Sequence, residues 1–331
     1  MNSARLEQFL RETLGVDDPL EIEGRALSGS SNITVFIRLG DVALVLRRPP
    51  PGELLPTAHD MMREAAFLKA LAGTAVPVPQ LIAKCEDRSV LGAPFYVMSR
   101  VDGIVVQQEP PENLRDPAAL EAACGNVVDC LAALHSIEWS GLGLPGRPHG
   151  YLERQVARWQ AQLALTPSAS RLPRLEVVTA WVSAHVPEQR ATTIVHGDYG
   201  LHNLILDRSE PRVRAVLDWE MATLGDPIAD LIWFLQGWGV ATEPGVGNPA
   251  NYLTTWPGAP SRSAMMDRYQ AQTGRAVENE LFYRVFSTWK GIIVTEGLYD
   301  AFLKGEAANP AVARFETQVP AQVERARALL E

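Results

Sequence analysis

The sequence is poor in cysteine, in long apolar runs and in positive charge. Its three cysteines, Cys85, Cys124 and Cys130, are odd in number, and none of their spacings suits a zinc site. We therefore expect buried free thiols in a reducing compartment rather than a disulfide framework. The formal net charge of -9 disfavours a general binder of nucleic acid or of an anionic membrane, since either needs a basic face.

Signals for export or membrane insertion are also missing from the pattern. The N-terminal stretch MNSARLEQFLRETLGV is charged and amphipathic and has no apolar signal core. No uninterrupted apolar run reaches the length that spans a bilayer. The sequence therefore predicts a cytoplasmic protein, with no nucleic acid and no membrane among its partners.

The composition is that of a folded chain with more than one core. Hydrophobic residues make up 47% of the 331 positions, which is enough for two cores and too much for one compact unit. Charged residues make up 21%, a share that disfavours both a disordered chain and a coiled coil.

The first hundred residues follow the pattern of a small antiparallel sheet with helices. One predicted helix ends at Gly15, and a second, HDMMREAAFLKALAG, ends at Gly73. The dipeptide at 40–41, Gly-Asp, is a hairpin signal. The predicted strands cover roughly 20–27, 33–39 and 42–48, and two more lie in LIAKCEDRSVLGAPFYVMSRVDG with a turn between them.

From residue 116 onward the pattern becomes helical. Asp116 and Pro117 form an N-cap and first-turn signature, and the proline- and glycine-rich stretch 241–260 is typical of a loop. A hinge near 99–104 joins this helical part to the strand-rich part, and active sites commonly lie between two such lobes. Helices are predicted over 118–137, 151–164, 173–186, 227–238, 261–273, 277–304 and 308–330.

Polar chemistry is concentrated in the stretch VHGDYGLHNLILD. Within it, Asp198 is followed five residues later by Asn203, and a predicted hairpin, LILD–RSEPR–VRAVLDWE, returns the chain to Asp218. Two aspartates and an asparagine then converge at the ends of short strands, as phosphoryl transfer requires: one aspartate accepts the proton of the attacking hydroxyl, and the other two residues hold Mg²⁺. The same Asp-to-Asn step occurs in the protein-kinase catalytic loop, where Arg stands at the position of Gly197.

Other interpretations of this stretch compete with the first. Oxygen ligands from Asp and Asn suit Mg²⁺ better than Zn²⁺, which disfavours a zinc cluster. The histidines are interpreted as structural: His196 holds the loop in place, and His202 is a loop side chain near the site.

The segment HGDYGLHNLIL…VLDWEMATLGDPIADL resembles the aminoglycoside phosphotransferase-like superfamily of small-molecule kinases. The order of SGSSN, VALVLRRPPPG, REAAFLKAL, VPVP and PFYVMSRVDG extends the resemblance over nearly the whole chain. The most similar branch is that of phosphotransferase domains fused to, or encoded beside, acyl-CoA dehydrogenases. The resemblance implies an α+β, two-lobed, protein-kinase-like fold: a small antiparallel-sheet, nucleotide-binding N-lobe over 1–100 and a mainly helical catalytic and substrate lobe over 101–331.

The resemblance implies that Asp198 is the catalytic base and that Asn203 and Asp218 are the Mg²⁺ ligands. The SGSSN turn takes the place of the glycine-rich phosphate loop, where backbone N–H groups bind phosphate oxygens. Taken alone, this turn is better interpreted as an ordinary hairpin loop. Its residues assigned to the nucleotide are Gly29, Ser30, Ser31 and Asn32.

The remaining nucleotide contacts are also implied by the resemblance. Where kinases carry a lysine on the third strand, this chain has Arg47, with Arg48 as the alternative if the register differs by one. Glu64 matches the acid that pairs with this cation, although a solvated helix charge is the commoner outcome for such a residue. Backbone groups of Ser99 and Val101 would meet the adenine at the hinge; the alternative there is an edge strand followed by a linker.

Four further residues receive supporting roles. Asp226 is predicted to cap a helix. By analogy with kinases, Asp230, one turn further on, holds the backbone of the catalytic loop, whose N–H groups would be the donors that a buried aspartate must find. Lys290 and Glu296 lie on a helix that lines the acceptor pocket in one interpretation and packs in the core in the other.

The implied activity is phosphorylation of a small-molecule hydroxyl, with ATP or another NTP and Mg²⁺ as cofactors. The dehydrogenase-linked branch implies a hydroxyacyl-CoA acceptor, that is, an acyl-CoA thioester, and an acyl-CoA dehydrogenase in the same pathway. Aminoglycosides, amino alcohols and sugars are the alternative acceptors. A nucleotide-binding pseudokinase without turnover is the alternative function.

Overall fold

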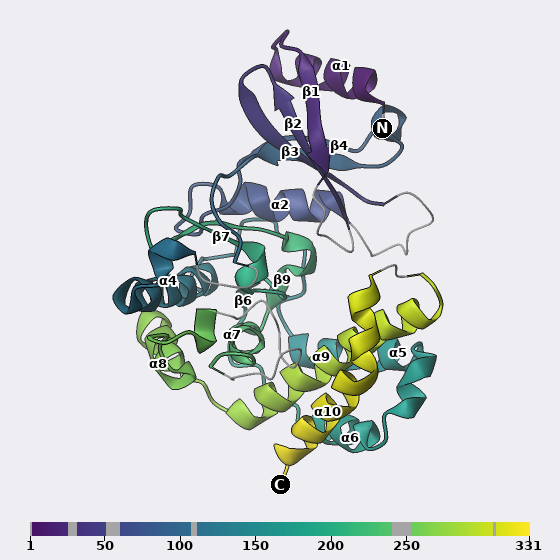
Figure 1. Cartoon of the computed structure of the whole chain (residues 1–331), viewed down its shortest axis with the longest axis vertical. Coiled ribbons are helices and arrows are strands. Elements are labelled where there is room, and N and C mark those ends of the chain that lie inside the picture. The colour runs from purple at the N-terminus through teal and green to yellow at the C-terminus, as the bar shows by residue number, and fades with distance from the viewer. Residues whose placement is uncertain (1, 26–31, 51–59, 107–110, 240–252, 307–308) are drawn as a thin grey trace.

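The computed structural model describes residues 2–25, 32–50, 60–106, 111–239, 253–306 and 309–331. An antiparallel sheet with α1 on its outer side forms one lobe, and helices form most of the other (Figure 1). Helix α2 lies beneath the sheet, between it and the helical lobe (Figure 1). This arrangement is the two-lobed α+β fold that the sequence predicts.

Five strands form the sheet, in the order β1-β2-β3-β5-β4. Strands β2 and β3 pair along their whole length, with Leu39 opposite Val42, which is the two-residue hairpin predicted at Gly40-Asp41. The strands span Leu20–Arg25 (β1), Ile33–Leu39 (β2), Val42–Arg48 (β3), Leu81–Cys85 (β4) and Phe95–Ser99 (β5).

Most helices begin and end within a few residues of their predicted bounds. Asp116 and Asp226 cap α4 and α7 as predicted, each accepting hydrogen bonds from two backbone N–H groups. The helices span Ser3–Leu14 (α1), Met61–Leu71 (α2), Arg88–Leu91 (α3), Pro117–His135 (α4), Tyr151–Ala164 (α5), Leu175–Ala184 (α6), Pro227–Leu235 (α7), Arg262–Thr273 (α8), Glu280–Leu303 (α9) and Phe315–Ala328 (α10).

Three predicted boundaries are wrong for local reasons. The turn expected between β4 and β5 contains the one-turn helix α3, because Asp87 caps it and Gly92 ends it in the left-handed conformation. Helix α9 starts later than residue 277 because Asn279 has a positive φ of 53°. The last predicted helix is not continuous, since Pro310–Arg314 forms a separate 3₁₀ helix before α10.

The two faces of the sheet pack into different cores. Leu46 of β3 packs in a cluster with α1, whereas Val45 packs in a second cluster with α2 and the helical lobe. Side chains alternate along a strand, so Arg47 shares the α2 side with Val45, and Arg48 shares the α1 side with Leu46.

Helix α4 belongs to the core of the helical lobe. It is the one helix of the described segments whose length and composition would allow it to cross a membrane. Leu120, Val127 and Leu131 on it are fully buried in the main hydrophobic cluster, and it packs against α8 and β6. Its apolar character is therefore explained by packing inside the protein.

Two short strand pairs frame the polar stretch. The predicted hairpin is formed by β7 (Leu204–Leu206) and β8 (Val213–Val216). A second pair, β6 (Thr193–Val195) with β9 (Thr223–Gly225), was not predicted, because three-residue strands carry too little pattern. Residues 196–203 follow β6 and lead into β7, and are called the catalytic loop after their predicted role.

The chain passes from the sheet into the helical lobe through a close approach of two backbones. After β5 ends at Ser99, Ile104 and Leu206 exchange two backbone hydrogen bonds of 2.8 Å. A side chain at Gly103 would place its Cβ 2.4 Å from the Leu206 carbonyl oxygen, so only glycine fits. The division of the chain into lobes at residue 100 stays a prediction.

Candidate active site

Asp198 lies at the centre of a set of hydrogen bonds within the catalytic loop. Its Oδ2 lies 3.2 Å from His202 Nε2 and 3.2 Å from Asn203 Nδ2, and its Oδ1 accepts a hydrogen bond of 3.2 Å from Trp233 Nε1. The Asp198 side chain is 39% exposed, so the carboxylate is held in place and can still be reached.

The surroundings of Asp198 favour its ionised form. Burial acts to raise its pKa, but the hydrogen bond with His202 and the nearby charges of His202 and Lys290 outweigh burial and lower the pKa below its usual value. A carboxylate that stays ionised at neutral pH can accept a proton.

Asn203 and Asp218 are brought together by the β7–β8 hairpin. The Asn203 carbonyl accepts a hydrogen bond of 2.8 Å from the N–H of Leu217, the residue before Asp218. The Asn203 side-chain nitrogen donates to the Asp198 carbonyl at 3.0 Å, which leaves the amide oxygen as the side-chain atom that can bind a cation. Asp218 has a φ of 63°, a left-handed conformation that aspartate tolerates better than most residues do.

Arg47 connects the sheet to these acids. Its Nη2 lies 3.3 Å from Asp218 Oδ1, and its Nε lies 3.6 Å from Glu64 Oε2. Of the two candidate arginines, Arg47 is thus the one beside Glu64 and Asp218, whereas the Arg48 guanidinium donates to the Pro49 carbonyl. Burial alone would lower the pKa of Arg47, but Tyr96, Glu64 and Asp218 together raise it.

Glu64 is fully buried, so the alternative of a solvated helix charge is wrong. Its carboxylate accepts hydrogen bonds from Tyr96 Oη at 2.8 Å and Asn32 Nδ2 at 3.0 Å. These partners come from β5 and from the end of the SGSSN turn, far from Glu64 in the sequence. Burial raises the pKa of Glu64 to about 7, although Arg47 acts to lower it.

Sequence reasoning missed Glu220, which follows Asp218 in the quoted motif LDWE. Glu64, Asp218 and Glu220 each place a carboxylate oxygen within 4.8 Å of the other two. Carboxylate oxygens are hard donors that suit Mg²⁺, so the chemistry of this cluster fits that ion. The pair of acids one residue apart in LDWE is the signal that would have found Glu220.

The catalytic loop is anchored from α7, as predicted for Asp230. The Asp230 carboxylate accepts hydrogen bonds from the backbone N–H groups of His196, at 2.6 Å, and Gly197, at 2.9 Å. His196 is buried, and its Nε2 lies 2.8 Å from the Leu217 carbonyl. These contacts confirm that Asp230 and His196 support the loop.

Gly197 explains why this loop lacks the arginine of the kinase pattern. Its φ is 82°, and a Cβ at this position would lie 2.8 Å from the carbonyl oxygen of Met221. A residue with a side chain would have to adopt a strained conformation and displace the neighbouring backbone. The close packing of the loop on the segment after Asp218 therefore requires glycine.

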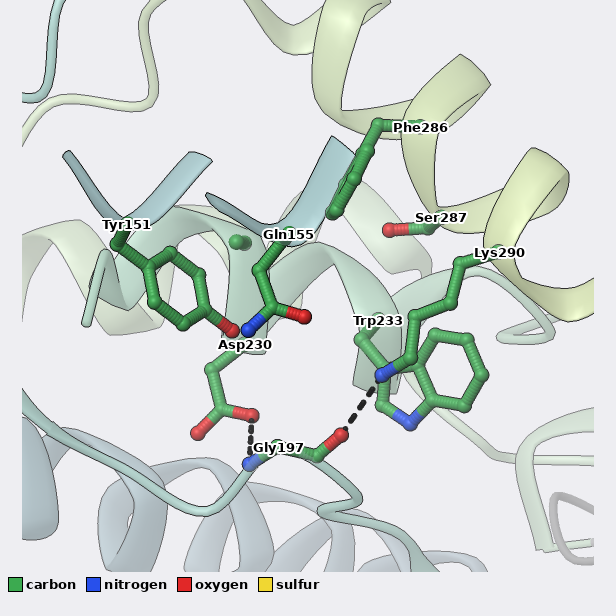
Figure 2. A pocket seen from close by; sticks show the side chains of 9 residues that line it. Tyr151, Gln155, Gly197, Asp230, Trp233, Phe286, Ser287 and Lys290 are labelled. Atoms are coloured by element: carbon green, nitrogen blue, oxygen red, sulfur yellow. Dashed lines mark hydrogen bonds between the residues drawn. The ribbon is translucent and has the colours of Figure 1, made fainter. Parts of the chain in front are cut away.

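The two predicted pocket residues of α9 have different surroundings. Lys290 is buried, donates to the Gly197 carbonyl at 2.9 Å and lies 3.7 Å from the centroid of the Trp233 ring system (Figure 2). A cavity of about 10 Å³ lies beside it, which is room for about one water molecule. Glu296 is fully buried and forms a two-fold contact with Arg171, at 2.6 and 3.0 Å, so the core interpretation applies to it.

The remaining predicted contacts are resolved only in part. Gly29, Ser30 and Ser31 lie outside the described residues. Ser99 ends β5, and its backbone N–H already donates to the Gln80 carbonyl at 2.9 Å. An adenine contact at Ser99 would therefore need its carbonyl group, and the contact at Val101 stays a prediction.

Comparisons with known proteins identify the class of this chain. The model of the phosphotransferase enzyme family (APH) matches residues 23–273. A candidate aminoglycoside phosphotransferase from Ralstonia eutropha has a solved structure that is 31% identical, covers 99% of this chain and 98% of its own, and superposes with a TM-score of 0.82. The chain therefore belongs to the phosphotransferase enzyme family.

Two further similarities are informative. Acyl-CoA dehydrogenase family member 10 of Mus musculus is 35% identical over 92% of this chain, and the chain spans 29% of the length of that protein. A mutant of aminoglycoside phosphotransferase APH(4)-Ia, solved with AMP-PNP and hygromycin B, is 16% identical with a TM-score of 0.60, and each chain is 98% covered. The second similarity shows the fold alone.

These findings confirm three predictions: the family, the two-lobed kinase-like fold and the enzyme class, a phosphotransferase among the small-molecule kinases. The roles of individual site residues stay predictions.

Proposed function

We propose that this chain is an ATP- and Mg²⁺-dependent phosphotransferase that phosphorylates a hydroxyl of a small molecule, with Asp198 as the catalytic base. The observation that carries this proposal is the convergence of three side chains. Asn203 is hydrogen-bonded to Asp198, its backbone holds the residue before Asp218, and Asp218 lies beside the buried Arg47.

In the proposed reaction, Asp198 accepts the proton of the acceptor hydroxyl. The hydroxyl oxygen forms a bond to the γ-phosphorus of ATP as the bond from that phosphorus to the β,γ-bridging oxygen breaks, and ADP leaves. Arg47 binds phosphate oxygens and keeps its charge at all physiological pH values. Asn203 and Asp218 would hold Mg²⁺, which when bound neutralises charge on the phosphates.

We further propose a hydroxyacyl-CoA as the acceptor. The names of several relatives, acyl-CoA dehydrogenase family members 10 and 11, support a place beside acyl-CoA chemistry. A phosphorylated hydroxyl is also a better leaving group for a later elimination, a chemical reason for an acyl-CoA dehydrogenase in the same pathway. The predicted cytoplasmic location stays a prediction.

The charges near the catalytic loop support an anionic acceptor over a polycationic aminoglycoside. Burial is the main cause that lowers the pKa of both Arg63 and Lys290, and the charge of Arg158 lowers each further. Carboxylates act in the opposite direction on both pKa values: Asp60 on that of Arg63, and Asp198 and Asp230 on that of Lys290. Among the described residues, none of the three cations has an ion-paired carboxylate: Arg63 and Lys290 donate only to backbone carbonyls, and Arg158 lies over the Trp159 ring.

The experiment that tests this function is product mass after incubation with ATP and Mg²⁺. The panel holds hydroxyacyl-CoAs, aminoglycosides, choline-like alcohols and sugars, and Asp198→Asn serves as the control. A gain of one phosphoryl group on the hydroxyacyl-CoAs, absent in the control, is the expected result. A gain on another class would refute the acceptor, and bound ATP without any gain would favour the pseudokinase.

A further inference from the structure

A buried lysine, which forms no ion pair with any residue that the structure describes, lies directly behind the catalytic loop. Lys290 is 8% exposed, and among the described residues its one hydrogen-bond partner is the Gly197 carbonyl. Buried lysines are rare and costly when unpaired. Packing alone does not explain a charged residue at this position, because an apolar side chain of similar length would fill the same space.

The backbone of Gly197 is held at both its N–H and its carbonyl group. Asp230 accepts a hydrogen bond from its N–H at 2.9 Å, and Lys290 donates one to its carbonyl, also at 2.9 Å (Figure 2). Asp230 thus fixes the peptide group between His196 and Gly197, and Lys290 fixes the next one, between Gly197 and Asp198. The second peptide group carries the N–H of Asp198, so its orientation sets where the Asp198 side chain begins.

Trp233 connects the lysine to Asp198. The Lys290 ammonium lies 3.7 Å from the centroid of the Trp233 ring system, within cation–π distance. The indole N–H of the same residue donates to Asp198 Oδ1 at 3.2 Å. One aromatic side chain therefore contacts both the buried cation and the proposed base.

We infer that Lys290 and Trp233 are positioning residues for the phosphoryl transfer, which together orient the Asp198 carboxylate. The inference rests on the proposed function, because it treats Asp198 as the base. Lys290 fixes the Gly197 carbonyl and the ring of Trp233, and Trp233 in turn fixes Oδ1. Because both oxygens belong to one planar carboxylate, fixing Oδ1 also fixes the position of Oδ2, which contacts Asn203 and His202.

The charge of Lys290 depends on groups from three elements. Burial lowers its pKa to about 8, while the carboxylates of Asp198 and Asp230 act to raise it and Arg158 of α5 acts to lower it. Tyr151, which lines the same cavity, stays neutral because burial raises the pKa of its phenol. Lys290 is therefore protonated at neutral pH and loses its charge in mildly alkaline solution.

The sharpest test compares two tryptophans that both face Lys290. Trp233→Phe keeps an aromatic ring and removes only the N–H that reaches Asp198. The matched control is Trp159→Phe. The Trp159 ring lies 5.8 Å from Lys290 Nζ, and its indole nitrogen has no hydrogen-bond partner within the described part of the chain. Because a hydrogen bond to a charged group contributes measurably, we expect Trp233→Phe to lower kcat about tenfold or more with the KM for ATP unchanged, and Trp159→Phe to have no effect on either.

A second variant tests the lysine itself. Lys290→Met keeps the length of the side chain and removes the charge, so we expect the same loss of kcat and the disappearance of the alkaline decline in the pH profile of kcat. Wild-type kcat in Trp233→Phe, or wild-type kcat with an unchanged pH profile in Lys290→Met, would overturn the inference.

A measurement that needs no turnover separates this inference from the proposed function. The pKa of Lys290 is read from lysine side-chain NMR, with its signal assigned by its loss in Lys290→Met. We expect Asp198→Asn to lower this pKa, because the Asp198 charge raises it. An unchanged titration would overturn the inference even if the enzyme is a kinase, whereas a lowered pKa with no transfer to any acceptor would support the contact and refute the function.

Discussion

Two buried cations of this protein differ in what surrounds them. On the sheet side, Arg47 lies beside the carboxylates of Glu64 and Asp218, and its pKa is raised. On the helical side, Lys290 donates to a backbone carbonyl, and its pKa falls to about 8. The surroundings of Arg47 keep its guanidinium charged at every physiological pH, whereas the Lys290 ammonium can lose its proton in mildly alkaline solution.

The difference fits the two tasks that the proposal assigns to the two sides. Phosphate binding needs a positive charge at every pH, and a cation that stays charged beside acids also limits their mutual repulsion before Mg²⁺ binds. Orienting a base needs geometry rather than permanent charge. Substitutions on the two sides test these tasks separately, and they are ordered from the largest expected effect to the smallest.

Removing the base is expected to have the largest effect. Asp198→Asn should lower kcat by about 10²–10⁴-fold, the usual contribution of general acid–base catalysis, while nucleotide binding stays largely intact. Quenched-flow assays and calorimetric titration with a non-hydrolysable ATP analogue measure the two quantities. Turnover near the wild-type rate would show that Asp198 is not the base.

Removing the proposed metal ligand Asp218 should affect nucleotide binding rather than the chemical step. Asp218→Ala is expected to lose the Mg²⁺-dependent part of nucleotide binding, because Asp218 is one of three acids whose carboxylate oxygens lie close together. The measurement is nucleotide affinity with and without Mg²⁺. Glu220→Ala is the matched comparison, and unchanged Mg²⁺ dependence in Asp218→Ala would place the metal elsewhere.

The role of Arg47 can be tested by replacing it with a neutral residue. Arg47→Met leaves Glu64 and Asp218 without their partner, and breaking a buried ion pair costs about 3–5 kcal/mol. We expect a lower free energy of unfolding and a higher KM for ATP. Arg48→Met, on the other face of the strand, should change neither by much; equal effects of the two would contradict the orientation of β3.

The lowered pKa of Lys290 predicts that the free energy of unfolding depends on pH, with a definite sign. Between about pH 8 and the ordinary lysine pKa of 10.5, the unfolded chain binds a proton at Lys290 that the folded chain does not. Stability therefore rises with pH in this window. The free energy of unfolding of the wild type minus that of Lys290→Met should increase from pH 8 to pH 10, as measured by urea denaturation; a flat difference would contradict the lowered pKa.

Local signals predicted the parts of the fold that local chemistry determines. The β2–β3 hairpin follows from alternating apolar residues around Gly40-Asp41, and its observed strands match the predicted ones. The choice between Arg47 and Arg48 stayed open, because alternation says that one faces the site and not which one. That choice follows from the packing of Val45 on α2, a contact between distant parts of the chain.

Spacing alone predicts the site only where its residues share one motif, whereas Arg47 and Glu64 were assigned through the family resemblance. Asp198, Asn203 and Asp218 lie in a single hairpin unit, so their spacing predicts their convergence. Glu64 and Lys290 gave no such signal, because burial depends on partners far away in the sequence: Tyr96 for the first and Gly197 for the second. A lone charge on a helix looks solvated until its neighbours are known.

The most direct test of the account is a single-turnover experiment with enzyme in excess over ATP and the acceptor identified by the mass panel. ADP and phosphorylated acceptor are measured in the same quenched samples. The account predicts that both form together in the wild type and that Asp198→Asn binds ATP but forms both far more slowly. Equal rates in the two proteins, or ADP formed with free phosphate and no phosphorylated acceptor, would contradict it.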